Sequence, residues 1–185
     1  MSYKIVVDSC CELPEQYKKD SRFQSIPLGL EVGDYQILDD ENFNQKEFLA
    51  KVAACPTCPK SNCPSPELFR EAYHDEAGEI YVVTLSSHLS GSYNSAELGK
   101  KLYEEKYGSK KIHVVDSESA SCGETQLAMK IMEYKESDES SKREMRYVME
   151  VCQEMYDAGY GFVSDKIKNE KFDSFFIEDG KIRPK

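Results

Sequence analysis

The chain has 185 residues, which is enough for one ordinary domain and a short extension. Hydrophobic residues make up 39% of it, and Asp and Glu outnumber Lys and Arg by 34 to 24, so the formal charge is −10. Nucleic-acid binding and adsorption to anionic lipid both normally need a basic surface, so this charge balance argues against both functions.

The sequence carries no predicted export signal or membrane span. The apolar run Ile5–Val7 is far shorter than a signal-peptide core, and no apolar stretch reaches transmembrane length. The seven cysteines are an odd number, and Cys10 and Cys11 are adjacent, which disfavours a disulfide framework. We therefore expect reduced thiols and a cytoplasmic location.

Three short apolar runs rich in β-branched residues are predicted strands. They are Lys4–Val7, Ile80–Leu85 and Ile112–Val115, and each is followed by small or polar residues. Continuous apolar runs are typical of strands that are covered on both faces, as in a parallel sheet.

Helical patterns alternate with these strands or follow them. Pro66–Tyr73, Ser92–Tyr107 and Glu144–Ala158 place apolar residues at helical spacing. The alternation predicts an α/β fold in which a mostly parallel sheet is flanked by helices. We assign this lobe to residues 1–158 and regard residues 159–185 as a short remnant, too small to bury a core of its own. The segment Cys55–Pro66, with four prolines and three cysteines, is predicted to be a loop.

The loop after the middle strand carries the clearest candidate site. Ser90 and Gly91 precede the predicted helix that starts at Ser92. Glycine lets a ligand approach the backbone, and a helix start offers free N–H groups to an anion. Ser90 adds a hydroxyl donor, so a carboxylate or phosphate would fit here. The alternative is that Ser90 and Ser92 only cap the helix.

Metal binding and serine hydrolysis are weaker interpretations. Cys55 and Cys58 have ligand spacing, but Cys63 alone does not complete the four ligands of a structural zinc site, and the nearest histidine is His74. The chain lacks a G-x-S-x-G motif, and His88 lies too close to Ser90 in sequence to be assigned as its base. We expect no metal, no cofactor and no catalytic residue.

Five motifs resemble those of the DegV family, in the same order and spacing. The most distinctive is Thr84–Ala96, which is similar to the family's Ser-Ser-x-Leu-Ser-Gly-Thr-Tyr-x-Ser-Ala pattern. The other four are Val7–Ser9 with Glu12–Pro14, Ser25–Leu28, Pro59–Ser65, and Val114–Ser117 with Ser121 and Gly123.

This resemblance implies a carrier that holds a long-chain fatty acid by its carboxylate and presents it to a separate fatty-acid kinase. By position, Ser61 corresponds to the threonine whose hydroxyl donates to the carboxylate. Ser90 and the Gly91 N–H correspond to the second hydroxyl and a backbone donor. The family's Thr-Ser-Gln has become Ser61-Asn62-Cys63, which keeps the hydroxyl and alters the loop.

The second lobe that the resemblance implies is nearly absent. Phe162–Asp165 resembles its start, and Phe176–Ile182 resembles a strand and turn from deeper inside it. We hypothesise that the chain is truncated, internally shortened or written without segments of a longer protein. Two other functions remain open. One is an enzyme for a small phosphorylated or hydroxylated substrate that depends on His88 or Asp116, and the other is a regulatory interaction module without ligand.

Overall fold

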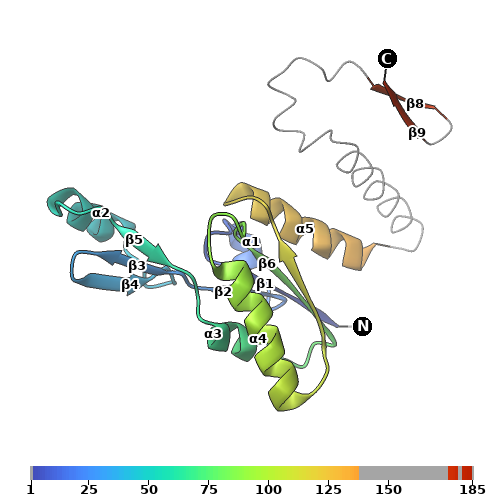
Figure 1. Ribbon diagram of the computed structural model, residues 1–185, viewed down its shortest axis with the longest axis horizontal. Coiled ribbons are helices and arrows are strands. Elements are labelled where there is room, and N and C mark those ends of the chain that lie inside the picture. Colours follow the sequence, from blue (N-terminus) through green and yellow to red (C-terminus); the bar gives the residue numbers. More distant parts are fainter. Residues whose placement is uncertain (1, 138–174, 179–180, 185) are drawn as a thin grey trace. The chain divides into compact units, whose positions relative to one another are not determined.

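Four parallel strands form the central sheet of the protein (Figure 1). The computed structural model describes residues 2–137, 175–178 and 181–184. The sheet has the order β2-β1-β6-β7. Its strands are β1 (Tyr3–Asp8), β2 (Phe23–Ile26), β6 (Glu79–Thr84) and β7 (Lys111–Asp116). The three strands predicted from apolar runs are confirmed as β1, β6 and β7.

Helices cover both faces of this sheet, which explains its continuous apolar strands. On one face, α3 (Pro66–Tyr73) and α4 (Ser92–Tyr107) pack on a core that contains Val6 and Val82. On the other face, α5 (Cys122–Glu136) and the short α1 (Glu15–Lys18) pack on a core that contains Val7. The predicted α/β architecture is confirmed.

Local sequence sets the ends of the two predicted helices that lie in the described residues. Ser65 caps α3, since its side chain accepts the N–H of Leu68 at 3.5 Å, and Pro66 occupies the first turn. α4 ends at Gly108, whose φ of +87° favours glycine. Both helices have the bounds that the sequence predicts.

A second, antiparallel sheet departs from the prediction. It has the order β4-β3-β5 and lies with α2 (Gln45–Ala54) to one side of the central sheet in Figure 1. Its strands are β3 (Gly29–Val32), β4 (Tyr35–Leu38) and β5 (Lys60–Asn62). The prediction of a loop over Cys55–Pro66 is therefore wrong, because the segment contains β5 and its last residue begins α3. β5 is an edge strand of three residues, and the neighbouring prolines lie outside it, where no ladder hydrogen bond is needed.

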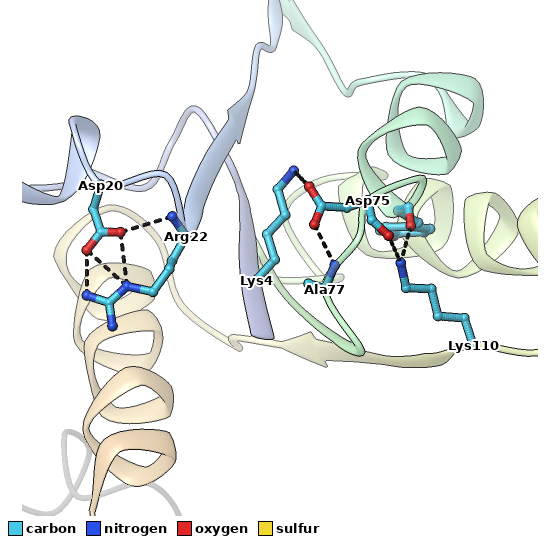
Figure 2. Close-up of polar contacts among 7 residues, drawn as sticks. Lys4, Asp20, Arg22, Asp75, Ala77 and Lys110 are labelled. Atoms are coloured by element: carbon cyan, nitrogen blue, oxygen red, sulfur yellow. Dashed lines mark hydrogen bonds and ion pairs between the residues drawn. The ribbon is translucent and has the colours of Figure 1, made fainter. Parts of the chain in front are cut away.

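Polar contacts connect the segments at the amino end of the central sheet (Figure 2). Lys4 forms an ion pair with Asp75 at 2.8 Å, and the Asp75 carboxylate also accepts the N–H of Ala77 at 2.8 Å. Lys110 donates to the main-chain oxygen of Asp75 at 2.6 Å. These contacts lie at the opposite end of the strands from the residues predicted to bind a ligand.

The chain divides into two units, Met1–Lys135 and Glu136–Lys185. The second contains an antiparallel pair, β8 (Phe175–Glu178) and β9 (Lys181–Pro184), where the sequence predicts a strand and a turn. The predicted helix Glu144–Ala158, the segment Phe162–Asp165 and the boundary at residue 158 lie outside the described residues, so these remain predictions. Within the described ranges, no helix is long and apolar enough to cross a membrane.

Close packing of α3 against α4 requires glycine at position 99. A Cβ there would lie 2.7 Å from the main-chain oxygen of Pro66 and 2.8 Å from the Phe69 Cβ. We expect Gly99→Ala to lower the free energy of unfolding by about 1–3 kcal/mol in urea denaturation, despite the higher helix propensity of alanine. Gly78→Ala is the control, because its Cβ would lie 3.6 Å from the Ser2 oxygen, and its effect should stay within about 0.5 kcal/mol. A Gly99→Ala variant as stable as the parent chain would contradict this packing argument.

Candidate functional site

The strand order creates a topological switch point in the central sheet. β1 pairs with β2 on one side and β6 on the other, so the chain reverses its direction of winding between β1 and β6. In open α/β sheets, ligands bind beyond the carboxyl ends of the strands at such a point. We call this the carboxyl edge, formed by the loops that follow Asp8, Thr84 and Asp116.

Hydrogen bonds connect the three loops of the carboxyl edge. The Asp8 carboxylate accepts the N–H of Leu85 at 2.9 Å, and the Asp116 carboxylate accepts the N–H of Ser87 at 3.0 Å. The N–H of Ser86 donates to the Ser119 oxygen at 2.9 Å. The loop that leads into α4 is therefore held from both sides.

Ser90 and Gly91 lie at the start of α4, as the sequence predicts. The Ser90 hydroxyl oxygen accepts the N–H of Ser92 at 3.2 Å and lies 3.2 Å from the Ser92 hydroxyl oxygen. This contact supports part of the capping interpretation. It does not use the N–H groups of Gly91 and Tyr93, for which no acceptor is found in the described part of the chain. The helix start therefore keeps donors for an anion.

Ser61 lies on the exposed edge strand β5, whose end reaches the start of α4. Cys63, two residues further on, has its Sγ 3.7 Å from the Ser95 hydroxyl oxygen. A Cβ at Gly91 would lie 2.9 Å from that same Sγ, so the close approach needs a glycine. The structure thus brings the segment that carries Ser61 next to Gly91. We call Ser61, Ser90 and Gly91 the head-group site, and its role as a binding site remains a prediction.

Two apolar side chains of the small sheet share a face with Ser61. Ser61 pairs with Leu30, and Leu30 pairs with Ile37 on the far strand. Directly paired residues project from the same face of a sheet, so these three side chains share a face. A cavity of about 390 Å³ on this sheet is lined by Gly29, Leu30, Gln36, Ile37, Leu38 and Asn62.

A larger cavity, of about 750 Å³, lies beside the ends of β1 and β2. It has an apolar part with Leu13 and Phe23. The charged residues that line it are Glu12, Lys18, Asp39, Asp40 and Glu41. Four carboxylates against one ammonium group disfavour a negatively charged ligand here.

Two buried carboxyl groups meet behind the start of α4. Asp8 and Glu124 are both fully buried, and their side chains lie against each other. The Ser92 hydroxyl, also fully buried, interacts with the same Asp8 carboxylate. Burial and the negative charge of Asp8 raise the pKa of Glu124 to about 8. Burial also raises the pKa of Asp8, although the N–H of Leu85 and the Ser92 hydroxyl oppose the rise.

The sequence places Asp8 directly after a predicted strand but does not single out Glu124. A signal was present, because Ser121 and Glu124 have the spacing of a capping box. The Ser121 N–H does donate to Glu124 Oε1 at 3.1 Å, and Ser121 has a φ of +54°. The pattern explains the position of Glu124 in the first turn of α5, but not its burial against β1.

The other candidate chemistries have separate surroundings in the structure. His74 packs on Tyr107 with ring centroids 4.6 Å apart, and His113 stacks on Tyr81 at 4.9 Å. Cys55 Sγ lies 3.2 Å from the Thr57 hydroxyl oxygen. Across the described ranges, no three His, Cys, Asp or Glu side chains are placed to hold one metal ion.

The family described as "Uncharacterised protein, DegV family" matches residues 2–162. A DegV domain-containing protein of Streptococcus gordonii is 41% identical over 129 residues, which are 69% of this chain and 45% of that protein. The chain thus spans about half the length of the relatives it matches.

Solved structures give the same match. A DegV-family protein of Ruminococcus gnavus, solved with vaccenic acid, is 52% identical with a TM-score of 0.71. The match covers 73% of this chain and 49% of the Ruminococcus gnavus chain. The Streptococcus pneumoniae Fatty Acid Kinase (Fak) B3 protein, loaded with linoleic acid, is 35% identical with a TM-score of 0.63, over 70% and 47% of the two chains.

The buried carboxyl pair makes stability depend on pH. In the unfolded chain Glu124 loses its proton near the ordinary pKa of 4.5, whereas in the folded chain it keeps the proton up to about pH 8. The folded state therefore binds more protons in this window, and its stabilisation is lost as the pH rises through it, by at most about 1.4 kcal/mol per pH unit. We expect Glu124→Gln to remove this part of the slope in urea denaturation between about pH 5 and 8. The exposed Glu105→Gln should keep the parent slope. An unchanged slope in Glu124→Gln would contradict a proton on Glu124 in the folded chain.

Proposed function

The chain belongs to the DegV family, and on that premise we propose that it binds a long-chain fatty acid by its carboxylate at the head-group site. The donors would be the hydroxyls of Ser61 and Ser90 and the N–H of Gly91. The observation that carries this proposal is the position of Ser90 and Gly91, at the start of α4 and at the point where the winding of the sheet reverses.

Neutral donors are sufficient for such a site. A carboxylate accepts charge-assisted hydrogen bonds from hydroxyl and amide groups, and the positive end of the α4 dipole adds to the attraction. The contact of Cys63 with Ser95 supports the placement of Ser61 near these donors. An overall charge of −10 is compatible with this site, because the donors act over hydrogen-bond distances.

The acyl chain would lie along the face that Leu30 and Ile37 share with Ser61. Each buried methylene contributes about 0.8 kcal/mol, so apolar contact would supply most of the affinity and the donors would set the orientation. The rest of a full-length family member would enclose more of the acyl chain.

We further propose that the protein is a carrier without catalysis of its own, and that a separate kinase acts on the bound carboxylate. The name and linoleic acid content of the Streptococcus pneumoniae relative support this role. Hydroxyls and an amide are suited to holding a carboxylate rather than to activating it. A cytoplasmic location fits such a partner, and the free thiols of Cys10, Cys11, Cys55, Cys58, Cys63 and Cys122 support it.

Removal of either hydroxyl tests the head-group site. We expect Ser61→Ala and Ser90→Ala each to weaken oleate binding by about ten-fold or more in calorimetric titration, because each loses a hydrogen bond to a charged group. Ser109→Ala is the matched control, since Ser109 is exposed and precedes β7 at the other end of the sheet. Unchanged affinity in both variants would contradict the site, and an absence of oleate binding by the parent chain would contradict the function.

A further inference from the structure

A continuous set of buried polar groups runs from α5 to the head-group site. Glu124 lies against Asp8, and Asp8 lies against the hydroxyl of Ser92. The Ser92 hydroxyl oxygen lies 3.2 Å from that of Ser90. Glu124, Asp8 and Ser92 are all fully buried, so water does not screen them.

The hydrogen bonds favour a proton on Glu124 rather than on Asp8. Asp8 accepts the N–H groups of Leu85 at 2.9 Å and Cys10 at 3.2 Å, so its negative charge is well stabilised. Glu124 accepts one N–H on Oε1, from Ser121, while its Oε2 has no hydrogen-bond partner among the described residues. Glu124 therefore has fewer donors than Asp8 to stabilise a negative charge, so the proton belongs on Glu124.

Two buried carboxylates in contact would repel each other, and each would lack solvation. The proton on Glu124 therefore holds the beginning of α5 against the end of β1. Through Ser92, the same pair sets the position and the electrostatic potential of the first turn of α4. Loss of the proton to solvent would place a second negative charge behind the donors of the head-group site.

From these contacts we propose that Asp8 and Glu124 are positioning residues for the head-group site, and that the affinity for a carboxylate falls when their shared proton is lost. The inference rests on the proposed function, because it concerns the same site. It adds a role for two residues that do not touch the ligand and a dependence of binding on pH.

The groups that face the pair do not supply another source for this dependence. The thiols of Cys10 and Cys11 lie beside it, and burial raises their pKa values to about 11 and about 12, so both stay neutral below pH 9. Ser92 and Ser121 face it from the starts of α4 and α5 and do not titrate. No Lys, Arg or His in the described ranges forms an ion pair with either carboxyl group.

The test compares the parent chain with Glu124→Gln, which is neutral at every pH and can still donate to Asp8. The ligand is dodecanoate at concentrations where it is monomeric, since its carboxylate is ionised throughout the range. Between about pH 6.5 and 9 the parent chain should lose about ten-fold in affinity, whereas Glu124→Gln should keep an affinity close to that of the parent at pH 6.5. Glu105→Gln, an exposed change on α4, should show the parent decline.

A second measurement on the ligand-free chain keeps the two proposals distinguishable. In NMR spectra, the amide signals of Gly91 and Ser92 should shift with a midpoint near pH 8 in the parent chain and stay constant in Glu124→Gln. Amides that do not titrate in the parent chain, or an equal loss of affinity in both chains, would overturn the positioning role and leave the proposed function standing. Titrating amides in a chain that binds neither dodecanoate nor oleate at pH 6.5 would overturn the proposed function, and with it the effect on affinity.

Discussion

The candidate site depends on the contacts of the buried Asp8 carboxylate. Asp8 is the last residue of β1, and its carboxylate accepts the N–H of Leu85, the first residue of the loop that leads to α4. The Ser92 hydroxyl and the Glu124 carboxyl group complete its surroundings. An uncompensated charge in this position would be very costly, and this cost favours a structure in which the loops after β1 and β6 and the start of α5 stay together.

This arrangement lets an acidic protein offer a site for an anion. The chain carries a formal charge of −10, yet the start of α4 presents hydroxyl and amide donors whose effect is local. The ion pair of Lys4 with Asp75 lies at the amino end of the same sheet. The two ends of the strands thus differ in role. An ion pair joins segments at the amino end, whereas the carboxyl end keeps donors available for a ligand.

The sequence was sufficient to predict the elements whose pattern is local. The β-branched runs predicted β1, β6 and β7, and the Ser90–Gly91 pair marked the start of α4. It was not sufficient for β5, a three-residue edge strand among prolines, because its pairing with β3 depends on a partner far along the chain. Glu124 was missed for a similar reason. A glutamate in the first turn of a helix is normally solvated, and only the packing of α5 on β1 buries this one against Asp8.

A crystal structure of this chain grown with oleate would test the central claim most directly. The account predicts a carboxylate within hydrogen-bond distance of the hydroxyls of Ser61 and Ser90 and the N–H of Gly91, with the acyl chain against Leu30 and Ile37. Oleate bound with its carboxylate in the acidic cavity beside Asp39 and Glu41, while the start of α4 holds no ligand, would contradict it.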